Sequence, residues 1–152
     1  MKIRSLFLAA VIILTAFFSG CVQKRAGDLH DGYYRAEAEY FNNYGWKEYV
    51  LIYISNGAII TVEYDAFNKS GFAKSWDLDY MRVMNIMDGT YPNEFARFYS
   101  VSLLNWQNPI KIDSVAGATH SYVSFKLLAE AAIKNAKTGE KHVALVDLPE
   151  ED

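Results

Sequence analysis

The fold is decided by the stretch "GWKEYVLIYISNGAIITVEYDAF", residues 45–67. Two runs rich in β-branched and aromatic residues flank Ser55, Asn56 and Gly57. Asn-Gly between such runs is the strongest short signal for a β-hairpin, because a type I′ turn needs positive φ at both central residues. The stretch therefore predicts two antiparallel strands joined by a tight turn.

The segment before this hairpin, "DGYYRAEAEYF" at residues 31–41, predicts a third strand. Apolar and charged side chains alternate along it, which is the period of a strand with one face in water. The apolar face consists of Tyr34, Ala36, Ala38 and Tyr40, and the charged face of Arg35, Glu37 and Glu39. Three consecutive antiparallel strands are the expected result.

Helical spacing begins after residue 75. One apolar stripe consists of Leu78, Met81 and Met84, and its neighbour, which suits core packing, of Trp76, Tyr80, Val83 and Met87. Asp88-Gly89 is expected to end this helix, and Pro92 suits the first turn of the next. That second helix carries Phe95, Phe98, Tyr99, Ser102 and Leu103 or Leu104.

The last part of the chain predicts a third helix. Asn108-Pro109 ends the second one, and "IKID" at residues 110–113 is expected to be extended. After Thr119, apolar residues recur every three or four positions as far as Ala136, and Gly139 suits the C-cap. Strands followed by helices indicate an α+β fold, an antiparallel sheet of about three or more strands packed with helices. Residues 141–152 suit either a last short strand or an acidic tail.

The N-terminus resembles a secretory signal of a lipoprotein. A basic start and a short apolar run are followed by Ser19, Gly20 and a lone Cys21. A signal peptide with an incidental free thiol is the alternative, but a leftover thiol is unusual in an exported protein. Residues 1–20 are therefore expected to be cleaved, Cys21 to be lipidated and inserted in a bilayer, and residues 21–28 to form the tether.

Charge and missing motifs exclude several functions. The chain has 15 basic and 18 acidic residues, and loss of Lys2 and Arg4 with the signal leaves 13 basic residues and a net charge of −5. This balance argues against a nucleic-acid partner. There is no CxxC, CxxCH, HExxH, GxSxG or Walker motif, so we expect no metal site and no catalytic residues of those kinds.

The stretch "DSVAGATHS", residues 113–121, is unusually poor in large side chains. A loop of small residues lets the backbone approach a ligand, and the helix N-terminus behind it suits a phosphate. Spacing alone favours a simpler role for Thr119, with its hydroxyl accepting a hydrogen bond from a backbone N–H near the N-cap.

This stretch resembles the Asp-x-x-[Ser/Thr/Ala]-Gly-Ala-Thr-x-[Ser/Thr] motif of the FMN-binding domain family. The family includes flavin-carrying subunits of sodium-pumping quinone reductase and of Rnf complexes, and a branch of small exported lipoproteins. Subunits of the sodium pump commonly have Ser or Thr at the position of Ala116, whereas the lipoprotein branch tolerates Ala. The similarity extends from about Asp31 to Lys137 and includes "DGYY", "AKSWDLDY" and "MDGTYP".

The resemblance implies that a flavin transferase joins the phosphate of FMN to the oxygen of Thr119. The flanking motif positions are Asp113, Ala116, Gly117, Ala118 and Ser121, and His120 is a further candidate phosphate contact. Candidate contacts of the flavin ring are Trp76, Tyr80 and Tyr91, with Met84 and Met87 less favoured. Lys74 and Asp77 either bond the cofactor or form a surface ion pair.

The expected protein is thus an electron-transfer carrier rather than a stand-alone enzyme. An FMN-binding domain spans residues 29–140, lipid-anchored on the extracytoplasmic face of a membrane, with membrane or extracellular redox partners. Two alternatives remain: a flavin-free surface lipoprotein that binds a ligand or protein through its tyrosines, and a domain that holds FMN without a covalent bond.

Overall fold

A computed structural model describes residues 29–149. The signal peptide expected at residues 1–20, the lipidated Cys21 and the tether at 21–28 lie outside the described residues. In chain order the elements are β1 (Gly32–Ala38), β2 (Lys47–Ser55), β3 (Ala58–Phe67), the 3₁₀ turn η1 (Lys74–Trp76), α2 (Leu78–Asp88), α3 (Pro92–Trp106), the 3₁₀ turn η2 (Pro109–Lys111), α4 (Thr119–Thr138) and β4 (Ala144–Val146).

The four strands form one mixed sheet in the order β3-β2-β1-β4. The first three are antiparallel neighbours, and β4 pairs in parallel with β1. The predicted hairpin is confirmed, since Asn56 and Gly57 have φ values of 52° and 71° between β2 and β3. Its turn is held to the start of β1 by the Gly57 N–H, which donates to the Asp31 carboxylate at 3.1 Å.

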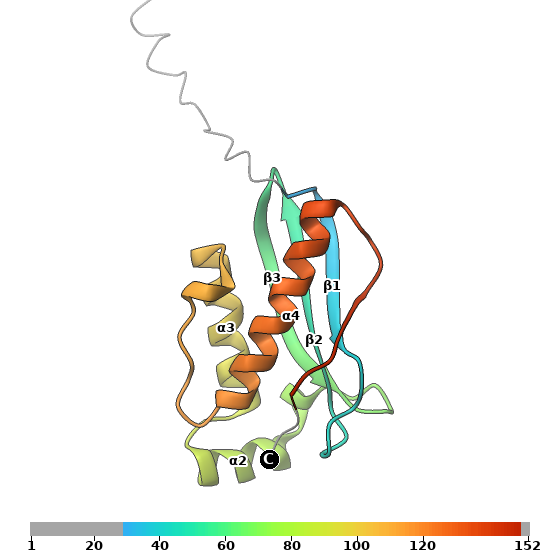
Figure 1. The fold of residues 1–152 in the computed structure, drawn as a ribbon. Coiled ribbons are helices and arrows are strands. Elements are labelled where there is room, and N and C mark those ends of the chain that lie inside the picture. The colour runs from blue at the N-terminus through green and yellow to red at the C-terminus, as the bar shows by residue number, and fades with distance from the viewer. Residues whose placement is uncertain (1–28, 150–152) are drawn as a thin grey trace, which may run out of the picture.

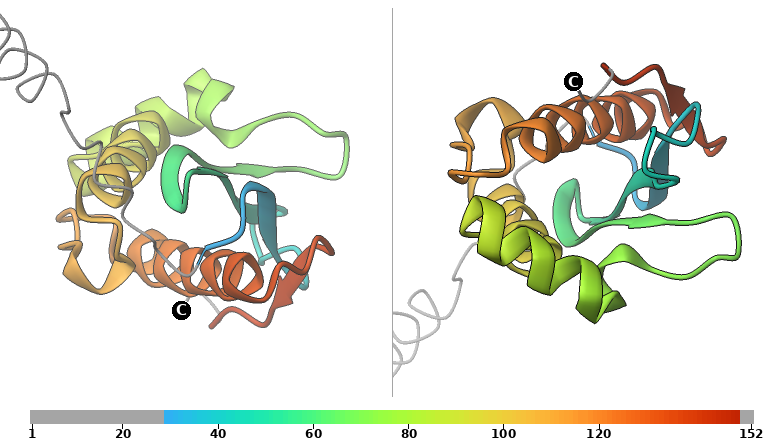
Figure 2. Two further views of the ribbon diagram at one scale, coloured as in Figure 1. Left: turned by 90° about the horizontal axis from the view of Figure 1, so that it is seen from above. Right: turned by 90° about the horizontal axis from the view of Figure 1, so that it is seen from below.

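Helices α3 and α4 cover one face of this sheet (Figures 1 and 2). The α+β prediction is confirmed, as is the buried face of α4. The core joins alternate residues of the strands to one stripe of each helix, and its fully buried large side chains include Tyr34, Val50, Ile52, Ile54, Tyr99, Leu103, Phe125 and Leu128.

Three local expectations are wrong. Tyr40 does not continue the buried face of β1, because the strand ends at Ala38 and the Tyr40 ring is exposed. The segment after Asn108 forms η2 rather than an extended piece, with the Asn108 carboxamide accepting from the Ile110 N–H at 3.0 Å. The expected helix after residue 75 exists, but it does not enter the core.

Helix α2 lies across the end of the domain at which α4 begins, and none of its residues is buried (Figure 1). Met84 packs against the edge of the core, whereas Leu78, Val83, Ile86 and Met87 are exposed. Core packing therefore does not explain its apolar stripes. The predicted end of the helix is confirmed, because Gly89 is a left-handed C-cap with φ of 72°.

None of the helices within residues 29–149 has both the length and the apolar character needed to cross a bilayer.

The exposure of α2 predicts a contrast between two aliphatic truncations. Ile86→Ala removes a side chain that is 79% exposed and should change the free energy of unfolding by less than about 0.5 kcal/mol. Leu103→Ala empties a fully buried site and should cost about 3 kcal/mol. Urea unfolding of both variants measures the two values, and a large loss in Ile86→Ala would show that α2 packs into the core.

Candidate functional site

The loop that leads into α4 is a compact turn. The Ala118 N–H donates to the Val115 carbonyl at 3.0 Å, and Gly117 at the third position has φ of 78°. Positive φ at that position of a four-residue turn favours glycine, as in type II turns. This geometry explains one of the small residues in "DSVAGATHS", since a side chain at Gly117 would strain the backbone.

A close backbone contact is a second reason for glycine at position 117. A Cβ on Gly117 would lie 2.2 Å from the carbonyl oxygen of Asp88, the last residue of α2. The loop therefore rests directly on the end of α2. The expectation that something approaches the backbone here is met by the protein itself.

Buried tyrosine hydroxyls hold this junction from inside the core. The Tyr99 hydroxyl accepts from the Val115 N–H at 3.1 Å and donates to the Ala118 carbonyl at 3.2 Å. The Tyr64 hydroxyl lies 2.9 Å from the Ser121 carbonyl and 2.8 Å from a Glu48 carboxyl oxygen. Burial raises the pKa of both phenols, and the Glu48 carboxylate raises that of Tyr64 further, so both remain neutral donors at neutral pH.

Thr119 is the first residue of α4 and is exposed. Its expected role as a helix cap is wrong, because Ala118 occupies the N-cap and no side chain caps this helix end. Within residues 29–149 the Thr119 hydroxyl makes no hydrogen bond. The first three N–H groups of a helix have no partner within it, so the hydroxyl lies beside free donors at the positive end of the helix dipole.

The other residues of the motif differ in how far they are buried. Ala118 is buried beneath the turn, and the Ser121 residue is buried with its carbonyl bonded to Tyr64. Asp113, Ala116 and His120 are exposed. Gly117 and Thr119 are exposed as well.

Lys74, Asp77 and Tyr80 form a second group at the opposite end of α2. The surface ion pair that was the alternative role of Lys74 and Asp77 does not form: Lys74 is 4% exposed, and its ammonium lies 4.9 Å from the centroid of the Tyr80 ring. Asp77 instead caps α2, accepting from the Tyr80 N–H at 2.9 Å. The Tyr80 ring also meets Trp46 edge to face at 6.0 Å, so this group is held mainly by its own contacts.

Trp76 and Tyr91 lie at different places along the same end of the domain. Trp76 is 71% exposed and lines a shallow groove between β3 and α3, opposite Asn93 and Arg97. Tyr91 is the N-cap residue of α3, and its carbonyl accepts from the first-turn N–H groups of that helix. The eleven residues of α2 span about 16 Å, which separates the loop of Gly117 from the group around Tyr80.

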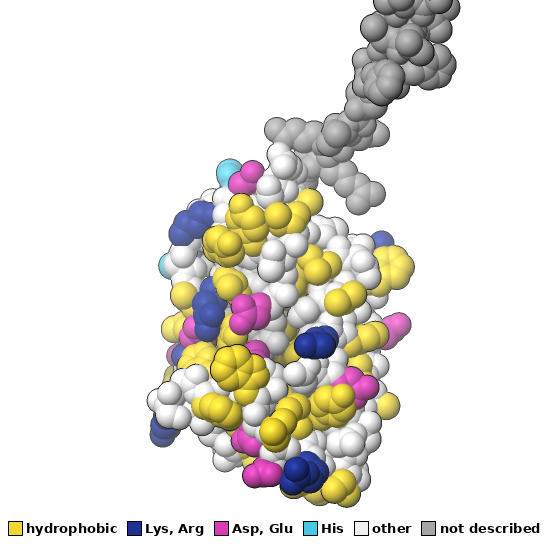
Figure 3. Space-filling view, turned by 180° about the vertical axis from the view of Figure 1, so that it is seen from behind, with side chains coloured by type: hydrophobic (Ala, Val, Ile, Leu, Met, Phe, Trp, Pro, Cys, Tyr) yellow, Lys and Arg dark blue, Asp and Glu magenta, His cyan; other side chains and the backbone are white. Residues whose placement is uncertain are grey.

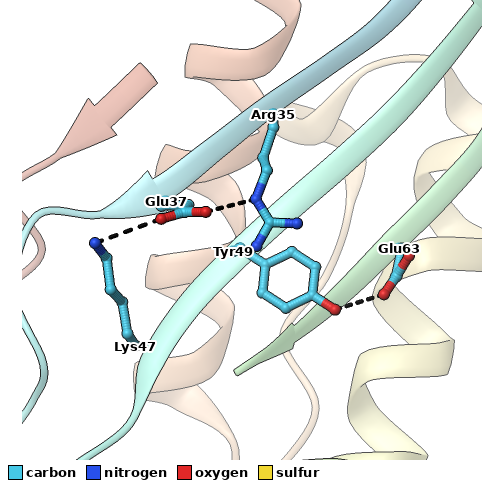
Figure 4. Close-up of polar contacts among 5 residues, drawn as sticks. All are labelled: Arg35, Glu37, Lys47, Tyr49 and Glu63. Carbon is cyan, nitrogen blue, oxygen red and sulfur yellow. Dashed lines mark hydrogen bonds and ion pairs between the residues drawn. The ribbon is translucent and has the colours of Figure 1, made fainter. Parts of the chain in front are cut away.

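The uncovered face of the sheet is the rival binding surface, and on the side of the molecule opposite α4 hydrophobic and charged side chains alternate (Figure 3). Tyr33 and Tyr53 stack with their centroids 4.4 Å apart. Arg35 lies 4.0 Å from the centroid of the Tyr49 ring, and Tyr49 donates to Glu63 (Figure 4). Burial raises the pKa of Tyr49.

The charged residues on this face are paired among themselves as well. Glu37 bridges Arg35 and Lys47, at 2.6 and 3.4 Å respectively (Figure 4). The aromatic rings and charges of this face thus satisfy one another.

Comparison with known proteins identifies one curated relative. The chain is 37% identical over 117 residues to a 15 kDa lipoprotein of Treponema pallidum (strain Nichols), covering 77% of this chain and 83% of the relative. The chain belongs to the family of this 15 kDa lipoprotein. It is accordingly a small lipoprotein of the cell envelope. No protein-family model matches the chain.

A solved structure supports the same fold for this lipoprotein family. The crystal structure of the CPE2226 protein from Clostridium perfringens superposes with a TM-score of 0.76 at 35% sequence identity. The match covers 80% of this chain and 99% of that one. The arrangement of sheet and helices is thus shared along nearly the whole of a related protein.

Sequence reasoning found the exposed motif but missed the residues that hold it. Tyr99 and Tyr64 were expected only as apolar or strand residues, because the spacing of a helix or strand does not show where a hydroxyl points. The one available signal is that both are tyrosines where phenylalanine would fill the core equally well.

The contact between Gly117 and Asp88 predicts unequal effects of two glycine substitutions. Gly89→Ala strains a left-handed residue whose Cβ would meet nothing within 4 Å, and should cost about 1–2 kcal/mol. Gly117→Ala has a similar φ and also drives its Cβ into the Asp88 carbonyl, so its cost should be at least twice as large. Equal losses in urea unfolding would mean that loop and helix separate easily.

Proposed function

We propose that this lipoprotein is an extracytoplasmic electron carrier with FMN joined through its phosphate to Thr119. The observation that carries the proposal is the exposed Thr119 hydroxyl, free of hydrogen bonds within residues 29–149, on a rigid turn at the start of a 20-residue helix. The motif resemblance to the FMN-binding domain family agrees with this position. A flavin transferase would join the FMN phosphate of FAD to the Thr119 oxygen and release AMP.

The residues around Thr119 fit a phosphate. The N–H groups of the first turn of α4 have no helical partner, and the helix dipole favours negative charge at this end. His120 is exposed beside the threonine. A phosphoester here would gain backbone donors without displacing any contact of the core.

Apolar surface for the flavin ring is present beside the same site. Gly117 rests on Asp88, so the exposed apolar side chains of α2 begin next to the Thr119 turn. Met87 is at the near end of α2 and Tyr80 at its far end, and Trp76 lies in η1 just before the helix. Bound flavin supplies the redox chemistry, while the protein sets its exposure and its potential.

The first described residues of the chain and the site lie at opposite ends of α4. The His30 N–H donates to the Ala136 carbonyl at 2.8 Å, so the chain enters the domain beside the C-terminal end of that helix. Twenty helical residues span about 30 Å. This geometry supports redox partners that approach from the aqueous side of the membrane.

The alternative function is a flavin-free lipoprotein that binds a ligand or a protein through the open face of the sheet. The stacked Tyr33 and Tyr53 favour such recognition, since aromatic rings suit binding surfaces. The paired charges around Arg35 and Glu37 argue against it, because a partner would have to replace contacts already made. Non-covalent FMN is a third possibility, and denaturation would release it.

Intact mass tests the covalent proposal. The soluble domain, without Cys21, is co-expressed with a flavin transferase and denatured. We expect a gain of one FMN less one water, mapped to the peptide that contains Thr119. Thr119→Val should abolish the gain while preserving the circular dichroism spectrum, because the side chain is exposed and almost isosteric.

Ser114→Ala is the matched control, because it removes an exposed hydroxyl from the same loop and should leave labelling intact. An unmodified mass for the unsubstituted domain, with another motif-bearing domain labelled in the same cells, would overturn the covalent proposal.

A further inference from the structure

We infer that Tyr99 is a positioning residue for flavin attachment, holding the turn before Thr119 in the shape that the flavin transferase must bind. This inference rests on the proposed function. Its structural basis is the bridge that one buried hydroxyl makes between the two ends of the turn, the Val115 N–H and the Ala118 carbonyl.

The bridge closes a turn that is already tight. The Ala118 N–H donates to the Val115 carbonyl from within the turn, and the Tyr99 hydroxyl joins the remaining polar group of each end residue from the core side. Ala116 and Gly117 lie between the bridged ends and are exposed. The next residue is Thr119, so the bridge determines the direction in which α4 and its first side chain leave the turn.

The Tyr99 ring is fixed before it meets the loop. Tyr99 is fully buried in α3, stacks on Phe125 at 5.3 Å between centroids, and contacts Phe95 at 6.1 Å. Both rings come from the helices that cover the sheet. Its hydroxyl is consequently a stationary partner for the loop, and the phenyl ring can stay in place when the hydroxyl is removed.

Loss of the hydroxyl leaves the Val115 N–H without its partner, whereas the Ala118 carbonyl keeps the hydrogen bond from the Tyr122 N–H at 2.9 Å. Unpaired polar backbone near the core is unfavourable, so the turn should move outward to reach water. The transferase must place one threonine oxygen against a phosphate, so its rate depends strongly on the orientation of Thr119. The free energy of unfolding of the whole domain depends on that orientation much less. The effect on flavin transfer should therefore exceed any effect on folding.

Tyr99→Phe tests the role of the hydroxyl, and Tyr34→Phe is its matched control. Tyr34 is equally buried, but its hydroxyl has no hydrogen-bond partner among the described residues. Both variants keep an aromatic ring in the core. Purified flavin transferase and FAD are the probe. Initial rates of flavin attachment are measured for the unsubstituted domain and both variants, under conditions in which circular dichroism shows all three to be folded.

We expect kcat/KM for labelling to fall at least tenfold in Tyr99→Phe and to stay within twofold in Tyr34→Phe. Thr119→Ser in the Tyr99→Phe background should not restore the rate, because the defect is in the turn and not in the acceptor oxygen. Equal rates for Tyr99→Phe and the unsubstituted domain would overturn the inference.

Hydrogen exchange of the flavin-free protein provides a readout that does not depend on labelling. The Val115 amide should be protected in the unsubstituted domain and in Tyr34→Phe, and should exchange at least tenfold faster in Tyr99→Phe. If the unsubstituted domain takes no flavin, the proposed function fails while this measurement still decides whether the bridge exists. Fast exchange at Val115 in the unsubstituted domain would show that there is no bridge.

Discussion

The arrangement of the site depends on hydrogen bonds that two core tyrosines extend to the backbone at the start of α4. Backbone polar groups near an apolar core need partners. At this junction three such groups lie next to the core: the Val115 N–H, the Ala118 carbonyl and the Ser121 carbonyl. Tyr99 and Tyr64 bring a hydroxyl to them from α3 and β3. The core therefore determines the shape of the loop, although the loop itself faces water.

The same core separates the two ends of the domain. Helix α4 packs along β1 and β2 for its whole length, with the chain entry bonded to Ala136 at one end and Thr119 exposed at the other. A helix packed in this way cannot shorten or pivot without exposing Phe125 and Leu128. In the proposed carrier, the distance between the chain entry at His30 and the flavin at Thr119 is thus set by secondary structure.

Features that depend on neighbouring residues could be predicted from the sequence, whereas features that depend on tertiary packing could not. The Asn56-Gly57 turn needs only the backbone preferences of two residues, and the burial of α4 follows from a period that one helix carries. The apolar stripes of α2 are as regular as those of α4, yet α2 has no buried residue. Periodicity shows that a helix has an apolar face, but whether another element covers that face depends on where the chain folds back.

The site itself was predictable for a similar reason, and only in part. "DSVAGATHS" shows its small residues directly, so the exposed turn and its threonine could be found from nine letters. The residues that hold the turn are distant in sequence. Tyr99 is 16 positions from Val115 and 19 from Ala118, and Tyr64 is 57 positions from Ser121. Their hydroxyls gain meaning only when β3, α3 and α4 meet. The proposed attachment site thus has two parts. The sequence shows the acceptor threonine, but only the packed core shows the tyrosines that hold its turn.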